Sequence, residues 1–439
     1  MYEVILGRSE ADKRDLGLNG TVFLGKLYVK MGSTTSMSNK VYMDVARAHI
    51  VLVCGKRGTG KSYTLGAIAE EMANLPEEIA HRLSVLIIDT LGIFWTMRYP
   101  NEKDEELLEK WDLPKKGLNI NIYTPAGKFE EYKEKGIPTD YPFTIDPSEL
   151  GAEDWCGMFS ISLLDINGVA LERALDRVKE KQEKYDIEDI IKELQADQKV
   201  ETNIKLALEN RFAAAKAWGI FSKDSTPLKK IIKGGQVTVL DISVYKEWSI
   251  KTLVVGLLSR KLMQERMDER KKEELEDVQR GHSYFSETLE KKEDATPIVW
   301  IMIDEAHEFL PREGKTLATD ALVQILREGR QPGVCLVMAT QQPGEIHKDV
   351  TTQTDIVISH RITARRDVEA LNAMMQSYVS GDIQKYLNLL PSMRGAAVIL
   401  DDNSEKMYPV QVRPRFTWHG GEAPTALKAK GRAAAELGI

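Results

Sequence analysis

The sequence predicts an α/β protein with a mainly parallel central sheet, a small N-terminal β element and a helical insertion. Apolar runs of strand length alternate with stretches of helical spacing, which is typical of a parallel sheet covered on both faces. The first of these runs leads into a glycine-rich phosphate-binding motif, and a later one ends in two adjacent carboxylates. These observations together predict a P-loop NTPase.

The chain divides into segments of different character. Residues 1–45 hold short alternating runs broken by glycine, which predict an abbreviated β element, either a half-barrel or an extension of the sheet. We assign residues 46–150 and 231–415 to the two parts of the ATPase core. Residues 151–230 have apolar positions at helical spacing among many charges, which predicts a helical insertion. Residues 416–439 form a C-terminal tail with little to bury.

Several apolar runs predict the strands of the core. After HIVLVC, whose strand begins at His49, the predicted strands are Ser84–Asp89, Leu118–Thr124, Gln236–Ser243, Ile298–Asp304, Val334–Thr340 and Asp355–Ser359. The runs GAAVIL and YPVQVR predict a final β pair. A helix is expected over 249–270, and the charged segment 268–295 is expected to extend it into a mobile loop.

Composition and charge narrow the functional classes. The chain has 439 residues with 42% hydrophobic and 29% charged residues, as in ordinary globular proteins, and a net charge of −7. This charge provides no global basic field for nucleic acid, although a ring can concentrate basic residues in its pore. The three cysteines are far apart and form no metal-binding pair. Without a signal-peptide core or an apolar run of roughly 18 residues, we expect a soluble, cytoplasmic protein.

The segment GKRGTGKS fits the P-loop pattern in full. Its glycines let successive backbone N–H groups point at a phosphate, and the following helix adds its positive dipole end. Lys61 is expected to reach the β- and γ-phosphates, and the Ser62 hydroxyl to bind Mg²⁺. The bland alternative is a glycine-rich turn that binds nothing. The predicted ATP-binding residues are Gly55, Lys56, Arg57, Gly58, Thr59, Gly60, Lys61, Ser62 and Tyr63.

Two carboxylates follow the buried run IVWIMI. Asp304 is placed to hold the Mg²⁺ shell, as the aspartate at this strand end does in P-loop enzymes. Glu305 is predicted to polarise the attacking water as general base. In the alternative interpretation, the pair only caps the next helix.

Other strand ends supply weaker candidates. Gln341 follows a buried strand and is predicted to sense the γ-phosphate or its water; the alternative is an ordinary turn before Pro343. Asp89 either lines the site, holds a substrate-facing loop, or is a turn residue.

Arginines near these strands are candidates for an arginine finger. Arg330, in LREGRQPG with Arg327, is the first choice if its loop faces a neighbouring subunit, because a guanidinium stabilises charge on the transferred phosphoryl group. The alternative is a solvated surface arginine. Arg361 is the weaker candidate, and Arg365 and Arg366 either face a pore or are solvated.

The order of GKRGTGKS, SVLIIDTLG, QVTVLDIS, IVWIMIDEAH, LREGRQPGVCLVMATQQP and DIVISHRI resembles the HerA/FtsK superfamily, closest to the HerA-type (DUF87) ATPases, over roughly residues 40–415. The block from REGR to ATQQP is more specific than the P-loop. The 243 positions between Lys61 and Asp304 also suit this family.

The resemblance implies a RecA-like P-loop core in a homo-hexameric ring that moves double-stranded DNA. It implies Walker A roles for Lys61 and Ser62 and Walker B roles for Asp304 and Glu305. It further implies that Gln341 is the sensor and that Arg330 reaches a neighbour's ATP. The family's N-terminal β-barrel, which docks nuclease partners, is longer than the segment available here.

The leading functional hypothesis is a helicase or translocase that couples Mg-ATP hydrolysis to movement along duplex DNA. A second is an ATPase ring that regulates or scaffolds a protein effector or nuclease. A third, a secretion or conjugation coupling ATPase, is disfavoured by the lack of a predicted membrane anchor.

Overall fold

The structure is a computed structural model that describes residues 3–31, 34–282, 296–375, 383–391 and 393–421. Its described strands form one 13-stranded sheet in the order β1-β3-β2-β13-β12-β11-β4-β10-β9-β5-β8-β6-β7. The strands are β1 (Val4–Leu6), β2 (Thr21–Met31), β3 (Thr34–Asp44), β4 (Ile50–Cys54), β5 (Leu83–Asp89), β6 (Ile120–Pro125), β7 (Tyr141–Phe143), β8 (Val237–Asp241), β9 (Ile298–Ile303), β10 (Val334–Thr340), β11 (Ile356–His360), β12 (Ala396–Asp401) and β13 (Lys406–Val412).

The central part of the sheet is parallel, as predicted. Strands β11, β4, β10, β9, β5, β8, β6 and β7 run in the same direction. Antiparallel pairing begins at β12 and continues through β13 and β2 to β3. The N-terminal strands therefore extend the same sheet at one end.

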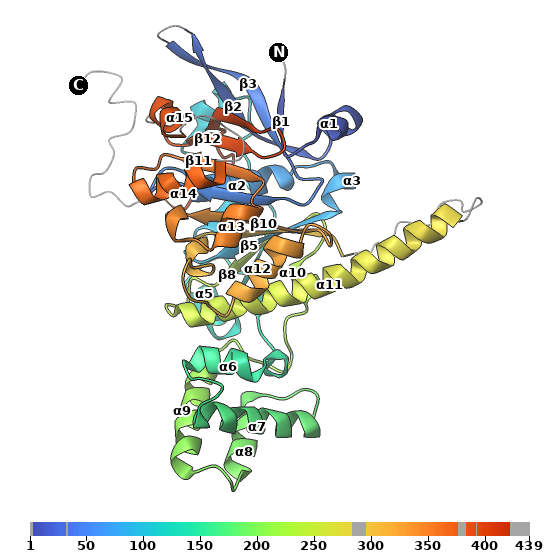
Figure 1. Cartoon of the computed structure of the whole chain (residues 1–439), viewed down its shortest axis with the longest axis vertical. Helices are drawn as coiled ribbons and strands as arrows, with labels where there is room; N and C mark the ends of the chain where they lie inside the picture. Colours follow the sequence, from blue (N-terminus) through green and yellow to red (C-terminus); the bar gives the residue numbers. More distant parts are fainter. Residues whose placement is uncertain (1–2, 32–33, 283–295, 376–382, 392, 422–439) are drawn as a thin grey trace.

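Helices cover both faces of this sheet (Figure 1). The α-helices are α1 (Glu10–Leu16), α2 (Lys61–Met72), α3 (Glu77–Ala80), α4 (Glu105–Lys110), α5 (Ala126–Glu134), α6 (Ala152–Phe159), α7 (Ile166–Lys181), α8 (Ile187–Ala196), α9 (Thr202–Ala217), α10 (Leu228–Ile231), α11 (Trp248–His282), α12 (Thr319–Glu328), α13 (Lys348–Gln353), α14 (Arg365–Met375) and α15 (Ile383–Leu389). The 3₁₀ helices are η1 (Phe94–Arg98), η2 (Pro147–Glu149), η3 (Ala306–Glu308) and η4 (Pro343–Glu345).

Each central strand contributes to two hydrophobic cores, because its side chains alternate between the faces. In β4, Val51 and Val53 pack in the core beneath α2, whereas Leu52 and Cys54 pack in the core beneath α11 and α12. Burial on both faces explains why these strands are continuous apolar runs in the sequence.

Helices α6 to α9 project away from the sheet (Figure 1). Trp155 centres a cluster of aromatic rings within them, at 5.0 Å from Phe212, 5.6 Å from Phe159 and 5.2 Å from Phe221 between ring centroids. The hydrophobic faces of these helices thus pack on one another as well as on the core.

Helix α11 begins near the predicted position and continues to His282, so the charged sequence up to that residue is helical. The rest of the predicted mobile loop, residues 283–295, lies outside the described residues. Among the described residues, no helix combines the length and the apolar character needed to cross a membrane.

The segment after Arg415 differs from the prediction. Phe416 and Thr417 are fully buried, so the expectation of little to bury was wrong for these residues. Their backbone N–H groups bind Glu70 on α2, at 3.1 and 3.2 Å. Because Glu70 lies far from the tail in the sequence, the tail residues themselves give no indication of this contact.

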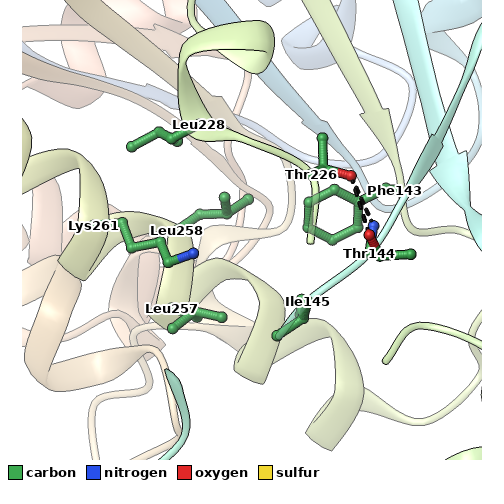
Figure 2. A pocket seen from close by; sticks show the side chains of 8 residues that line it. All are labelled: Phe143, Thr144, Ile145, Thr226, Leu228, Leu257, Leu258 and Lys261. Carbon is green, nitrogen blue, oxygen red and sulfur yellow. Dashed lines mark hydrogen bonds between the residues drawn. The ribbon is translucent and has the colours of Figure 1, made fainter. Parts of the chain in front are cut away.

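A small pocket lies where the insertion and α11 meet β7 (Figure 2). Its lining residues are Phe143, Thr144, Ile145, Thr226, Leu228, Leu257, Leu258 and Lys261. Lys261, the charged residue of this set, pairs with Glu149. The pocket is a mostly apolar gap in the packing between these elements, and it contains none of the predicted site residues.

Candidate nucleotide-binding and catalytic site

The predicted site residues other than Arg330 gather at the carboxyl edge of the parallel strands. The P-loop follows β4, Gln341 follows β10, and Asp304 follows β9, and these three strands are neighbours in the sheet. Ligands of open α/β sheets bind at this edge. The fold therefore brings together residues as distant in the sequence as Gly55 and Gln341, which are 286 positions apart.

The P-loop connects β4 to α2 with a backbone that requires glycine. Gly60 has a φ of 120°, a conformation that other residues rarely adopt. A Cβ atom at Gly55 would lie 2.6 Å from Thr59 Oγ1 and 2.7 Å from His360 Cβ, so a side chain has no room there. Both glycines are needed for the loop to curl in front of α2.

Lys61 is the first residue of α2 and is largely buried. Its Nζ donates a hydrogen bond of 3.3 Å to the carbonyl oxygen of Lys56 within the loop. Burial lowers the pKa of Lys61, whereas the nearby carboxylates of Asp304 and Glu305 oppose this change. A long bond to a neutral carbonyl leaves the ammonium available for a stronger anionic partner.

Ser62 and Asp304 meet across the site. The Ser62 hydroxyl donates a hydrogen bond of 2.5 Å to Asp304 Oδ2. The other carboxylate oxygen accepts the backbone N–H of Glu305 at 2.9 Å. Burial raises the pKa of Asp304, and the bond from Ser62 acts in the opposite direction. The two oxygen groups expected to bind Mg²⁺ are therefore adjacent.

Glu305 adopts a left-handed backbone conformation with a φ of 53°, which is uncommon for a glutamate. Its Oε1 accepts a hydrogen bond of 2.5 Å from Gln341 Nε2. Its Oε2 is buried and has no hydrogen-bond partner among the described residues. The His307 Nδ1 atom lies 3.7 Å from Oε2 and 3.1 Å from Thr340 Oγ1. One oxygen of the predicted base is thus oriented by the predicted sensor, and the other is unsatisfied.

His360 packs against the start of α2, next to the P-loop, and was not among the predicted site residues. It is fully buried, with Nε2 at 2.9 Å from Thr64 Oγ1 on α2 and Nδ1 at 3.1 Å from the carbonyl oxygen of Ala396. Burial lowers its pKa to about 4, so the ring is neutral. Its position at the carboxyl end of β11 is the signal that could have identified it.

Asp89 holds a loop at the same edge. It ends β5 and accepts backbone N–H groups from Leu91, Gly92 and Phe94 at 3.2, 2.7 and 2.7 Å. Burial, and then the neighbouring Asp241, raise its pKa to about 7. Of the interpretations left open for Asp89, both loop support and a turn residue agree with these contacts.

The two candidate arginine fingers lie at opposite edges of the sheet. Arg330 is exposed and precedes β10, whose 7 residues separate the two edges by roughly 20 Å. It does not join the site of its own chain. Arg361 follows β11 directly, and its carbonyl oxygen accepts the Lys56 N–H at 3.1 Å, so it lies beside the P-loop.

The neighbouring arginines are tied to local carboxylates. Arg327 binds Asp349 at 2.7 Å and Arg365 binds Glu369 at 2.8 Å. Arg366 pairs with Glu345.

The fold and this arrangement of motifs define the class of protein: a P-loop ATPase. The sequence profile described as the helicase HerA central domain (DUF87) matches residues 25–262, more than half of the chain, so the protein belongs to this family. A second profile, zonular occludens toxin (Zot), matches residues 236–368.

Individual relatives agree with this assignment. The chain is 30% identical over 150 residues to the DNA double-strand break repair helicase HerA of Pyrococcus furiosus, covering 33% of this chain and 27% of that protein. It is 38% identical over 72 residues to a probable HerA of Methanocaldococcus jannaschii, covering 16% of this chain and 14% of that protein. The matches thus span about a quarter or less of these relatives' length.

Among solved structures, VirB4 of Thermoanaerobacter pseudethanolicus shares the fold with a TM-score of 0.53 at 14% identity, covering 90% of this chain and 97% of that chain.

Proposed function

We propose that this chain binds Mg-ATP on the P-loop and hydrolyses it with Glu305 as general base. The observation that carries this proposal is the buried, unsatisfied Oε2 of Glu305, which directly follows Asp304, the residue whose carboxylate accepts the Ser62 hydroxyl. Leaving a buried acceptor unpaired costs about 1–3 kcal/mol, so the fold retains it for a partner that the protein does not supply.

The residues present fit a magnesium ion. The Ser62 hydroxyl and the Asp304 carboxylate are oxygen ligands of the kind Mg²⁺ prefers, and they are already adjacent. No cluster of three or more His, Cys, Asp or Glu in the described parts of the chain could hold a metal by itself. This agrees with an ion that relies on phosphate oxygens and water for its other ligands. When bound, Mg²⁺ neutralises charge on the β- and γ-phosphates.

The chain's own groups then divide the reaction. Backbone N–H groups of the P-loop and the ammonium of Lys61 hold the phosphates, with Lys61 exchanging the Lys56 carbonyl for a phosphate oxygen. Glu305 Oε2 accepts a proton from water as the water oxygen bonds to the γ-phosphorus and the bond to the bridging oxygen of ADP breaks. Gln341 donates a hydrogen bond to Oε1 of Glu305. In this proposal, release of the γ-phosphate changes this bond between the sensor, Gln341, and the base, Glu305.

Arg330 acts in trans in this proposal. Its exposed loop lies at the edge of the sheet opposite its own P-loop, so it serves a neighbouring chain if it serves any nucleotide. We therefore place the protein in a ring, a homo-hexamer by analogy with its family. Arg361, beside the P-loop, is the alternative finger acting within one chain.

Mixed rings separate these two fingers. Arg330→Ala and Lys61→Ala chains are each expected to be inactive. Mixing them should restore part of the ATP turnover, because an intact P-loop then meets an intact finger from its neighbour. Arg330→Ala chains that hydrolyse ATP normally by themselves, together with loss of turnover in Arg361→Ala, would assign the finger to Arg361.

The proposed work of the ring is translocation of double-stranded DNA. The similarity to the DNA double-strand break repair helicase HerA of Pyrococcus furiosus supports this assignment. A ring that regulates a nuclease or another effector protein is the second candidate, because the N-terminal strands β1 to β3 extend the sheet at its end and offer a surface for such a partner.

ATP turnover with and without linear duplex DNA distinguishes the two candidates. A DNA motor should be stimulated, and the stimulation should fall steeply between low and moderate salt because phosphate contacts release counterions. Turnover that ignores DNA at both salt concentrations would favour the protein partner.

A further inference from the structure

The segment after β13 crosses the outer side of the P-loop helix. We call residues 413–419 the C-terminal strap. The carboxylate of Glu70, fully buried on α2, binds this strap through both oxygens. Oε2 accepts Arg413 Nη1 at 3.0 Å and the Phe416 N–H at 3.1 Å, and Oε1 accepts Arg415 Nε at 2.8 Å. The strap is therefore fixed to the helix that follows the P-loop.

The helix is shaped to receive the strap. Gly66 lies in the middle of α2, where glycine costs stability, and a Cβ atom there would overlap the guanidinium of Arg415. The backbone N–H of Arg415 donates a hydrogen bond of 2.5 Å to the Tyr63 hydroxyl. These contacts extend the strap along α2 towards the P-loop.

At the P-loop end of the strap, the side chains of Tyr63, Arg415 and His419 come together, and each of them can stack on an aromatic ring. The rings of Tyr63 and His419 lie 5.3 Å apart at 76°. The guanidinium of Arg415 lies 5.8 Å from the Tyr63 ring centroid, and its Nη1 is 3.3 Å from His419 Nδ1. Tyr63 and His419 are both partly exposed. The cluster is thus open on one side.

We infer that Tyr63 and His419 form a platform for the purine base of the nucleotide, an inference that rests on the ATPase function proposed above. The γ-phosphate end of the site is fixed by Glu305 and Asp304, and Tyr63 follows Ser62 on the first turn of the helix that faces the phosphates. An aromatic ring next to the phosphate cradle offers a base a stacking surface. The strap supplies the second ring, so the C-terminal segment takes part in choosing the ligand.

The test compares two ligands that share their phosphates and differ in the base. Calorimetric titrations of the full chain with Mg-ATP and with Mg-tripolyphosphate are run on the unmodified protein and on His419→Ala. Stacking is worth about 1–3 kcal/mol per base, so the affinity for ATP should fall about tenfold or more. The affinity for tripolyphosphate, which has no base, should stay within about twofold.

A further variant controls the comparison. His81→Ala removes a histidine whose side chain is 65% exposed and which precedes β5 at the opposite edge, so both affinities should be unchanged.

The inference is overturned if His419→Ala binds ATP normally, or if it loses ATP and tripolyphosphate in parallel, since the strap would then only support the P-loop. If the unmodified protein binds neither ligand, the proposed ATPase function fails as well, which is a different result from either of these.

Discussion

Two clusters of buried charged groups, one at each edge of the parallel sheet, differ in how completely they are paired. At the amino edge, His49 lies between two carboxylates, with Nδ1 at 2.8 Å from Asp355 and Nε2 at 3.0 Å from Asp44, so each ring nitrogen has a partner. At the carboxyl edge, Glu305 Oε2 has no hydrogen bond among the described residues, and Lys61 has a 3.3 Å bond to a carbonyl.

This difference separates a structural polar cluster from a functional one. Buried charges that only stabilise the fold are fully paired, because any unpaired group costs free energy. Groups that bind a ligand must keep hydrogen-bond donors or acceptors that the protein itself does not occupy. The same sheet therefore holds a fully paired charged cluster around His49, away from the proposed ATP site, and incompletely paired charged groups where ATP is proposed.

Disrupting the paired charged cluster around His49, at the amino edge, should have the largest effect on stability. His49→Gln leaves the partly buried Asp355 without its cationic partner, whereas the buried Asp44 keeps its ion pair with Arg8 at 2.7 Å, and we expect a loss of about 3 kcal/mol in the free energy of unfolding. Denaturant unfolding measures it. A loss below about 1 kcal/mol would show that the triad is not a stabilising element.

The same edge should make stability depend on pH. The carboxylates of Asp355 and Asp44 raise the pKa of His49 to about 9, against the opposing effect of burial. A raised pKa stabilises the protonated folded form, so this contribution is complete below about pH 6.5 and is lost as pH rises to about 9. Its size is on the order of 3 kcal/mol.

Unfolding curves collected across this pH range test the dependence, with His49→Gln as the matched control. The variant should show a flatter profile. Equal slopes for the two proteins would remove His49 as the cause.

At the unsaturated edge, Glu305→Gln should retain ATP binding and slow turnover at least about a hundredfold, or about 2.7 kcal/mol, because the amide cannot accept the proton. Glu313→Gln, an exposed glutamate in the loop before α12, is the control and should turn over normally. Near-normal hydrolysis by Glu305→Gln would exclude it as the base.

The smallest effect is expected beneath the P-loop. Thr64→Val removes the hydroxyl that donates to His360 and leaves a buried acceptor unpaired, at a cost of about 1 kcal/mol or slightly more in unfolding free energy. Thr64→Ser keeps the hydroxyl and should be close to the unmodified protein. If Val and Ser variants are equally stable, the bond contributes nothing measurable.

The sequence alone predicted the strands and their direction well, for a physical reason. Strands buried on both faces must be continuous apolar runs, so Val334–Thr340 could be identified with its correct ends. The gathering of the P-loop, Asp304 and Gln341 at one edge followed from their positions after parallel strands. Their individual roles in hydrolysis remain predictions.

Other features have no local signal. His360 contacts Thr64 across 296 positions, and the buried tail residue Phe416 binds Glu70 across 346. A single sequence gives no indication that such distant residues are neighbours. The saturated triad of His49, Asp44 and Asp355 was missed for the same reason, since two of its members lie 306 positions apart.

Titration of the purified protein with a non-hydrolysable ATP analogue in the presence of Mg²⁺ tests the central claim most directly. We expect saturable binding that is lost in Lys61→Ala and strongly weakened when Mg²⁺ is removed by a chelator. If calorimetry detects no binding heat, or if Lys61→Ala binds as the unmodified protein does, the unpaired groups at the carboxyl edge do not bind a nucleotide.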